Sequence, residues 1–391
     1  MKVAFTLFGG KHWHGGINYL ANLFSALQES SSPVRPVLFT GTAVTESELG
    51  NLTPFLRDAP VKSILWDKGP ARKWRTLSAL SLQSDFQAER IFRDNGIDLV
   101  FQHSEWYGFR FALPTIAWIA DFQHRHLPQM FSRTNYLKRE LGYHALAYSA
   151  DTIMVSSASA RMDCESFYPA SREKLEVLPF AARVTRTDLP DIGESLRRHG
   201  LPRKFFFMPN QFWKHKNHLA MVAALRIARQ SNPDITIVCC GNLVDGREPA
   251  YPQRVLSAVK EAGLEDSFRV LGMIPFNELE ALLRTSAALI NPSLFEGWST
   301  TVEEAKAFGV PMLLSDIPVH RDQAPSSLFF NPYDAMDIAR VLVSAWQIFP
   351  PGPRLPEEQA AAVTSGLRRQ EFSTRFQQIA LLTLEKSSHG K

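Results

Sequence analysis

Short apolar runs alternate with amphipathic segments along most of the chain. Residues 3–8 form the first apolar run, and the apolar positions of residues 17–27, which follow, fall on one face of a helix. Continuous apolar runs between helices are typical of parallel strands that are covered on both faces of a sheet. The pattern therefore predicts an α/β protein with strands near residues 3–8, 37–40, 97–101, 115–120, 152–156 and 175–178, and again near 205–208, 235–240, 268–271, 288–291, 312–315 and 328–330. Helices are expected in the second half near residues 218–230, 252–262, 278–285 and 301–308.

The alternation is interrupted once. Residues 181–204 are polar, charged and contain prolines, which is typical of a linker. We expect one Rossmann-like domain over residues 1–185, a second over 200–365, and a C-terminal helix over 366–391 that packs back on the first domain. In such doubly wound sheets, ligands bind outside the carboxyl ends of the strands, and the cleft between two facing domains is the default site.

The composition is that of an ordinary globular protein. Of 391 residues, 45% are hydrophobic, and 43 Lys+Arg stand against 39 Asp+Glu, a formal net charge of +4. This composition excludes a disordered chain, and the chain lacks the dense positive charge of nucleic-acid binders. Cys164, Cys239 and Cys240 have no metal-ligand spacing and form no disulfide framework, which indicates a reducing compartment. No apolar run approaches the length that spans a bilayer, so we expect a cytoplasmic protein.

The most informative segment is residues 291–309, NPSLFEGWSTTVEEAKAFG, in which a strand ends and a helix begins near Thr300. Thr300 and Glu303 have the spacing of a capping box, which gives Glu303 a structural role and leaves Glu296 and Glu304 without one. A carboxylate one turn inside a helix can accept two hydrogen bonds from vicinal hydroxyls, such as those of a ribose. The start of the helix is electropositive and suits a diphosphate. It consists of Ser299, Thr300, Thr301 and Val302. From spacing alone, solvated surface positions are the alternative for both glutamates.

Glu296 and Glu304 form an E-x7-E motif that resembles the signature of retaining nucleotide-sugar glycosyltransferases of family four, which have the GT-B fold. Residues 269–275 and 315–322 also resemble this family, in order and at similar spacing. The resemblance implies two Rossmann-like domains that face each other across a cleft, with C-terminal helices. It further implies sugar transfer, with retention of configuration, from a UDP- or GDP-linked sugar to a hydroxyl of a glycan or lipid-linked glycan. In the family the second glutamate holds the nucleotide ribose and the first lies near the donor sugar, which implies these roles for Glu304 and Glu296.

Two lysines follow the first strand of the second half, in the segment PNQFWKHKNH at residues 209–218. An ammonium group before a helix can neutralise the charge that develops on a leaving nucleoside diphosphate. Family members usually have an arginine, a short spacer and a lysine here. Lys216 takes the place of the lysine, but Gln211 takes that of the arginine. We expect Lys214 to be the second cation, with a solvated basic loop as the alternative.

Two loops offer backbone groups rather than side chains. The first, GGKHWHGG at residues 9–16, lies between the first strand and the first helix, and Gly15 and Gly16 match the Gly-Gly pair that the family uses against the donor phosphates. A tight turn without a ligand is the alternative. The second loop begins at Gly272, where backbone groups can recognise the base. No GxGxxG is present, so the fingerprint of a nicotinamide-binding protein is missing.

Asp121 and His124 lie in a polar loop after an apolar strand. A neutral histidine at such a place can orient or deprotonate an acceptor hydroxyl, and an aspartate can orient the histidine. Many family members carry a histidine directly before the aspartate, where this chain has Ala120. We expect His124 to serve instead, with His126 as a second candidate and a structural role as the alternative.

The expected partners are a nucleoside-diphosphate sugar and an acceptor, without nucleic acid, cofactor or metal. Two H-x-H pairs begin at His12 and His124, but no carboxylate or cysteine completes a ligand set at useful spacing. Residues 68–77 are basic, with Trp74 among them. Such a run fits an anionic acceptor, peripheral contact with the inner face of a membrane, or a solvated loop.

Three other functions remain open. A nucleotide-sugar epimerase can share the same architecture, but acts without an acceptor. A dinucleotide oxidoreductase also suits doubly wound domains, although the missing fingerprint speaks against it. A non-catalytic sugar-nucleotide binding protein would bind the donor and never release nucleotide.

Overall fold

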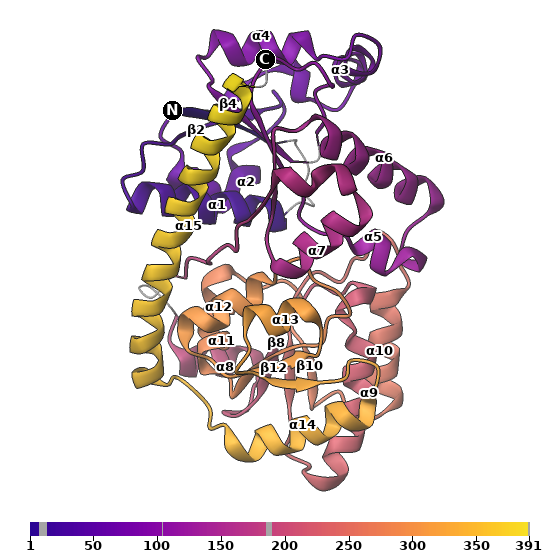
Figure 1. Ribbon diagram of the computed structural model, residues 1–391. Helices are drawn as coiled ribbons and strands as arrows, with labels where there is room; N and C mark the ends of the chain where they lie inside the picture. The colour runs from indigo at the N-terminus through magenta and orange to yellow at the C-terminus, as the bar shows by residue number, and fades with distance from the viewer. Residues whose placement is uncertain (8–13, 104, 185–189, 390–391) are drawn as a thin grey trace. The chain divides into compact units, whose positions relative to one another are not determined.

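The computed structural model describes residues 1–7, 14–103, 105–184 and 190–389. The chain divides into two compact units. Unit 1 consists of Met1–Arg125, Ser132–Ala181 and Leu367–Lys391, and unit 2 of His126–Phe131 and Ala182–Gly366. Each unit is built on one parallel sheet with helices on its faces (Figure 1). The expected α/β architecture of two Rossmann-like domains is therefore confirmed.

The sheet of unit 1 has the strand order β3-β2-β1-β4-β5-β6-β7. Its strands are β1 Lys2–Leu7, β2 Arg35–Thr40, β3 Val61–Lys62, β4 Leu99–His103, β5 Thr115–Trp118, β6 Thr152–Val155 and β7 Leu175–Val177. The helices between them are α1 His14–Glu29, α2 Glu46–Leu49, α3 Pro70–Ser81, α4 Phe86–Asp94, α5 Gln123–His126, α6 Arg133–Ser149 and α7 Ala158–Phe167, with the 3₁₀ turns η1 Gly50–Phe55, η2 Ile64–Trp66, η3 Pro128–Met130 and η4 Pro169–Lys174.

Aromatic side chains fill the core of unit 1. On one face of the sheet, Phe5 packs against Phe24 of α1 and Phe376 of α15 Leu355–His389, with ring centroids 4.8 and 6.1 Å away. On the other face, Phe39 packs against Trp66 and Phe92. From Leu367 onwards α15 belongs to unit 1, because its apolar face covers the sheet there.

The sheet of unit 2 has the order β10-β9-β8-β11-β12-β13. Its strands are β8 Phe206–Met208, β9 Ile237–Cys239, β10 Phe268–Val270, β11 Ala288–Asn291, β12 Met312–Ser315 and β13 Leu328–Phe330. Its helices are α8 Ile192–His199, η5 Lys214–Lys216, α9 His218–Ser231, α10 Tyr251–Glu261, α11 Phe276–Thr285, α12 Thr300–Phe308, α13 Pro318–Gln323 and α14 Ala335–Ile348. Neighbouring residues of β8 point to opposite faces: Phe206 packs with α9, α10 and α14, and Phe207 with α8, α11 and α12.

Each strand expected from the apolar runs is present, but the linker prediction for residues 181–204 was wrong in part. Residues 192–199 form α8, whose Leu196 is buried beside Phe205 in the core of unit 2. The Asp191 carboxylate accepts from the Glu194 backbone N–H at 2.7 Å and caps the helix. Charged residues outnumber apolar ones in this segment, so one buried leucine was too weak a pattern to reveal a helix.

Both sheets reverse their strand order at one place. In unit 2, β8 lies between β9 and β11, so the chain leaves the carboxyl ends of β8 and β11 toward opposite sides. In unit 1, β1 lies between β2 and β4 in the same way. Such a switch point leaves a crevice at the carboxyl ends of the two strands, where doubly wound proteins bind their ligands.

Candidate active site

A buried ion pair lies at the switch point of unit 2. Lys216 ends η5, which follows β8, and Glu296 lies in the loop after β11. Lys216 Nζ donates to Glu296 Oε1 at 2.5 Å, and the two side chains are only 14% and 11% exposed. The Ser293 hydroxyl donates to the same carboxylate oxygen at 2.7 Å. Burial alone would raise the pKa of Glu296, but the charge of Lys216 and these hydrogen bonds lower it to about 2.

Asn291, the last residue of β11, connects this pair to α12. Its Nδ2 donates to Ser299 Oγ at 2.9 Å and lies 3.5 Å from Glu296 Oε1, while its Oδ1 accepts from Ser293 Oγ at 2.6 Å. The amide is buried and bonded at both ends. The carboxylate of Glu296 is thus held in place before any ligand arrives.

The start of α12 differs from the expected capping box. Ser299, not Thr300, is the N-cap residue, which puts Glu303 one position too far along to reach back. Glu303 instead accepts from Lys306 Nζ at 2.9 Å and from Gln323 Nε2 at 3.0 Å. The Gln323 side chain also accepts from the backbone N–H of Ser299 at 3.1 Å. Gln323 of α13 therefore accepts the hydrogen bond of the N-cap N–H, the role that the spacing predicted for Glu303.

Glu304 lies one turn inside α12 in a very different environment. The residue is 6% exposed, and within residues 190–389 the structure gives its carboxylate no hydrogen-bond donor. Burial, with the charge of Glu280 added, raises its pKa to about 8. Glu304 lies close enough to Cys240 to add to the effect of burial on the pKa of that thiol, which is raised. Cys240 directly follows β9, so Glu304 lies beside the carboxyl end of that strand.

Two glycines shape the backbone after β9 and β10, on the side of Cys240. The Gly241 N–H donates to the Gly272 carbonyl at 2.9 Å, and Gly272 has a φ of +70°. A Cβ on Gly241 would lie 2.5 Å from the carbonyl oxygen of Asn210, so no other residue fits there. The predicted base-recognition loop at Gly272 therefore adjoins the ends of β9 and β10.

The structure does not bring Lys214 to this pair. Lys214 Nζ donates to Glu248 at 2.6 Å, and Arg254 bonds the other oxygen of that carboxylate at 3.2 Å. Gln211, at the place of the family arginine, accepts from the Asn242 backbone N–H at 2.7 Å. Lys216 is therefore the lysine that meets Glu296, and Lys214 as the second cation stays a prediction.

Sequence reasoning missed three polar side chains: Asn291 and His320 near the pair, and Gln323 at the start of α12. His320 Nδ1 lies 3.0 Å from Ser315 Oγ, whose hydroxyl donates to the Ser293 carbonyl at 2.6 Å. Burial lowers the pKa of His320. Polar residues at the very end of an apolar strand, as Asn291 and Ser315 are, were the available signal.

The predicted acceptor-side residues divide between the two units. In unit 1, His124 has no exposed surface, and its Nε2 lies 3.2 Å from Glu140 Oε2 and 3.3 Å from the Tyr168 hydroxyl. Asp121 accepts from Arg139 at 2.9 Å and from the Gln123 backbone N–H. A ring enclosed in this way does not reach an acceptor, so these contacts favour the structural alternative for His124.

His126 belongs to unit 2 and is exposed. Its ring stacks on Phe295, with centroids 5.0 Å apart and planes at 29°. Phe295 directly precedes Glu296. The second of the two candidate histidines is therefore the one that packs on the site loop.

The predicted phosphate loop is described only in part. Residues 9–13, including His12, lie outside the described residues. Gly15 and Gly16 lie in the first turn of α1, Gly15 exposed and Gly16 buried. The sequence predicted that the helix begins after Gly16, whereas it begins at His14, so both glycines belong to the helix; their contact with the donor phosphates stays a prediction.

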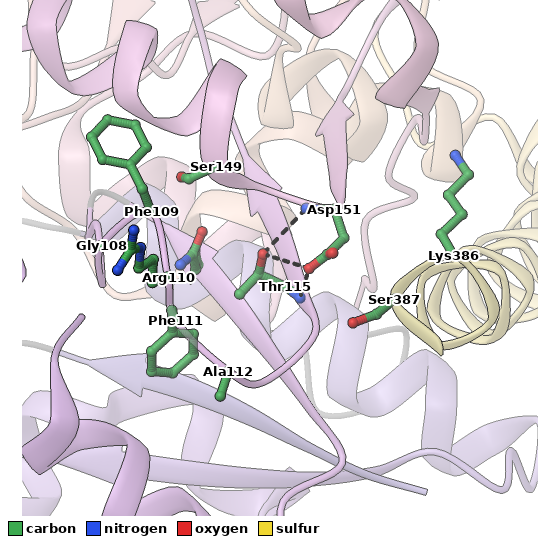
Figure 2. A pocket seen from close by; sticks show the side chains of 11 residues that line it. Gly108, Phe109, Arg110, Phe111, Ala112, Thr115, Ser149, Asp151, Lys386 and Ser387 are labelled. Atoms are coloured by element: carbon green, nitrogen blue, oxygen red, sulfur yellow. Dashed lines mark hydrogen bonds between the residues drawn. The ribbon is translucent and has the colours of Figure 1, made fainter. Parts of the chain in front are cut away.

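A hollow of about 380 Å³ in unit 1 contains none of the predicted site residues. Figure 2 shows Lys386 and Ser387 of α15 on one side, the loop residues 108–112 on the other, and Thr115 and Asp151 between them. Asp151 accepts from the N–H and the hydroxyl of Thr115 at 2.8 and 3.2 Å. Thr115 begins β5 and Asp151 precedes β6, so the hollow lies at the amino ends of these strands, away from the switch point.

Neither a metal-binding cluster nor a membrane-spanning helix is present among the described residues. No three or more His, Cys, Asp or Glu side chains gather there in a way that suits a metal ion. Among the same residues, no helix is long and apolar enough to cross a bilayer.

Residues 193–345 match the family model of glycosyl transferases group 1. They form a glycosyl transferases group 1 domain. The chain is 31% identical over 131 residues to the O-antigen chain mannosyltransferase RfbU of Salmonella typhimurium, covering 33% of this chain and 35% of that protein. It is 25% identical over 185 residues to the D-inositol 3-phosphate glycosyltransferase of Pseudarthrobacter chlorophenolicus, covering 46% and 43%. Such matches span about a third to a half of the length of these relatives.

Solved structures match the chain over nearly its whole length. The crystal structure of Anabaena HepE in complex with UDP and glucose has a TM-score of 0.68 at 14% identity, covering 98% of this chain and 99% of that one. A glycosyltransferase from Rickettsia africae has a TM-score of 0.68 at 12% identity, covering 100% and 99%. At these identities the likeness concerns the fold alone, and it confirms the GT-B fold. The group 1 domain contains Lys216, Glu296 and Glu304, whereas Asp121 and His124 lie outside it.

Proposed function

We propose that the protein is a retaining glycosyltransferase that moves a sugar from a nucleoside-diphosphate sugar to a hydroxyl of a glycan or lipid-linked glycan, without a metal ion. The observation that carries the proposal is the pair of contrasting carboxylates in the group 1 domain. Glu296 is ionised and held by Lys216 at the switch point, and Glu304 is buried without a donor among the described residues. The family match and the GT-B fold support the same reaction class.

The environment of Glu304 fits the ribose of a nucleotide. A buried carboxyl group without a donor is costly, since it has lost water and gained nothing in exchange. Two vicinal hydroxyls would donate to its two oxygens and repay that cost. Hydrogen bonds to the ionised form also lower a carboxyl pKa, so ribose binding would release the proton that Glu304 holds. The backbone of Gly241, which follows Cys240, and that of Gly272, bonded to it, would recognise the base.

Lys216 and the start of α12 fit the diphosphate. The backbone N–H groups of Thr300, Thr301 and Val302 have no intrahelical partner at the start of α12, and together with the positive end of the helix dipole they would bind an anion. Lys216 adds its ammonium group from η5. Groups fixed in this way stabilise charge where it develops, and each well-placed donor contributes roughly 3–4 kcal/mol to the transition state.

The reaction then needs no carboxylate nucleophile. The bond between the anomeric carbon and the diphosphate oxygen breaks, and the acceptor oxygen bonds to the same face of that carbon. The departing phosphate oxygen takes the acceptor proton, so the charges balance. Glu296 accepts from a hydroxyl of the donor sugar and keeps the ring in place, since its carboxylate is already ionised and oriented. His126, which packs on Phe295, is the histidine to test for contact with the acceptor.

The test uses the full chain with UDP- and GDP-linked sugars, with and without glycan acceptors. We expect nucleotide release that depends on the acceptor, and NMR of the product should show the anomeric configuration of the donor. Inversion would contradict the retaining mechanism. Epimerised donor in the absence of acceptor would show an epimerase instead, and donor binding without nucleotide release on any acceptor would show a binding protein. Activity should survive chelation by EDTA, and its loss would contradict metal independence.

A further inference from the structure

Helix α3, Pro70–Ser81, buries a charged residue and exposes large apolar ones. Its buried residues are Arg75 and Ala79. Its outward residues include Trp74, Leu77 and Leu80, which are 65%, 50% and 63% exposed. A helix that packs only for stability buries its large apolar side chains. Core packing therefore does not account for Trp74 and the two leucines.

The orientation of α3 is fixed by Arg75. Its Nε donates to Asp85 Oδ2 at 2.7 Å, and its NH1 donates to the Leu65 carbonyl at 2.9 Å and lies 3.4 Å from Glu105. Glu105 also accepts from Tyr107 at 2.6 Å. The arginine and both acids are nearly fully buried, so turning the helix over would leave charges unpaired in the core. The exposed apolar residues are held outward by this network.

Neighbouring elements extend the apolar surface. Helix α3 contacts η2 and α4, and Figure 1 shows α3 and α4 together at one end of unit 1. Ile64 of η2 is 63% exposed, and Phe86, which begins α4, is 55% exposed. Leu82, the C-cap residue of α3, is 59% exposed. The outward side of α3 is thus apolar beyond the helix itself.

The segment that contains α3 carries charges of one sign. Residues 68–84 contain four Lys or Arg and no Asp or Glu. Arg75 is neutralised inside, while Lys68 and Lys73 are exposed, and no hydrogen-bond acceptor for either side chain lies within the described residues. A second copy of the chain would bring two such positive surfaces together, which is unfavourable. An anionic surface complements both the charge and the apolar residues.

We propose that the outward face of α3, formed by Trp74, Leu77, Leu80, Lys68 and Lys73 and called here the α3 surface, docks on an anionic lipid bilayer. Tryptophan prefers the boundary between headgroups and acyl chains. The two leucines insert beside it, and the lysines reach the lipid phosphates. The helix lies along the membrane and does not cross it. This docking is independent of the proposed sugar transfer, because it needs no nucleotide.

The experiment measures flotation of the full chain with vesicles of phosphatidylcholine alone or mixed with phosphatidylglycerol, without any nucleotide. We expect binding only to the mixed vesicles, and weaker binding as salt is added. Lys68→Ala/Lys73→Ala should weaken it roughly tenfold or more, because each basic residue near such a surface contributes about 1 kcal/mol. Trp74→Ser/Leu77→Ser should abolish it. These positions are exposed, and circular dichroism of each variant checks that it folds.

A matched control lies on α6, where Leu137 and Leu141 are 57% and 70% exposed. Leu137→Ser/Leu141→Ser should bind the mixed vesicles as the wild type does. If the control variant loses as much vesicle binding as Trp74→Ser/Leu77→Ser, the assignment to α3 is overturned. It is also overturned if the wild type binds vesicles with and without phosphatidylglycerol equally. A dimer in light scattering that Trp74→Ser/Leu77→Ser dissociates would show that a second copy covers the surface instead.

Discussion

Glu296 and Glu304 are the same type of residue, eight positions apart, in opposite environments. The carboxylate of Glu296 accepts hydrogen bonds from the Lys216 ammonium and the Ser293 hydroxyl, which lower its pKa to about 2. That of Glu304 faces another acid and no donor among the described residues, and its pKa rises to about 8. In the proposed function, the surroundings of Glu296 are complete in the free protein, and those of Glu304 become complete when a ligand supplies hydrogen-bond donors. Titratable groups pushed apart in this way are typical of functional sites.

Among the substitutions that test the contrast between Glu296 and Glu304, Glu296→Ala should have the largest effect. The substitution leaves Lys216 buried beside no counter-charge, so the free energy of unfolding should drop by about 3 kcal/mol. Transfer should fall by at least about 100-fold, since an oriented group at the donor sugar is lost as well. Urea unfolding and nucleotide release measure the two effects. Wild-type stability in this variant would contradict the buried ion pair.

The pH dependence of stability should show the two carboxylates with opposite signs. The native pKa of Glu304 lies above its ordinary value of 4.5, so between pH 4.5 and 8 the native protein holds a proton that the unfolded chain has lost. Stability should therefore fall as the pH rises through this range, by up to about 5 kcal/mol in total. The pKa of Glu296 lies below 4.5, so its contribution is lost as the pH falls from 4.5 toward 2.

Glu304→Gln isolates the first of these effects. The amide cannot ionise, so urea titrations of this variant should show a flatter profile between pH 5 and 8 than those of the wild type. The acid side, which depends on Glu296, should be unchanged. A variant with the same slope as the wild type above pH 5 would assign that slope to another group.

A smaller effect is expected at the junction of α12 and α13. Gln323→Ala removes bonds to the backbone of Ser299 and to Glu303, and should cost about 2 kcal/mol of stability. Nucleotide affinity should fall roughly tenfold, because the helix start loses its support. Arg321→Ala in the same helix, an exposed partner of Asp316, is the control and should change neither quantity. Equal effects of the two substitutions would argue against a role of Gln323 at the helix start.

Lys214→Ala should have the smallest effect. Its pair with Glu248 is half-exposed, and such pairs contribute about 0.5 kcal/mol or less. Nucleotide release should fall far less than in Lys216→Ala, whose ammonium is buried against Glu296. If the two lysine variants lose activity equally, Lys214 reaches the diphosphate after all, as the sequence predicts.

The strands could be predicted from the sequence, because they depend on local pattern. The roles of Glu296, Glu304 and Lys216 came from the family resemblance and stay predictions. Apolar runs reveal the strands, and the spacing of Glu296, Glu304 and Lys216 is visible along the chain. The partners of these side chains could not be predicted in the same way. Gln323 meets Ser299 from 24 positions away, and Glu248 meets Lys214 from 34, because parallel sheets bring distant loops together.

Burial was the other quantity that the sequence did not reveal. His124 lies in a short polar helix with no apolar periodicity, yet Glu140 of α6 and Tyr168 enclose it. On α3 the opposite holds: Trp74 and Leu77 would be core residues by pattern, but Arg75 takes the inward position through Asp85. Which side of a helix is buried depends on partners that the local pattern does not contain.

The central claim is that Glu304, and not its buried neighbour on α12, receives the ribose. The most direct test is calorimetric titration of UDP and GDP into wild type, Glu304→Gln and Glu303→Gln at pH 7.5. Both substitutions are isosteric, and both positions are buried on the same helix. Glu304→Gln should weaken binding of the preferred nucleotide by roughly 10- to 100-fold, since it loses charge-assisted hydrogen bonds, while Glu303→Gln stays within a few-fold of the wild type. Equal affinity of wild type and Glu304→Gln would contradict the account.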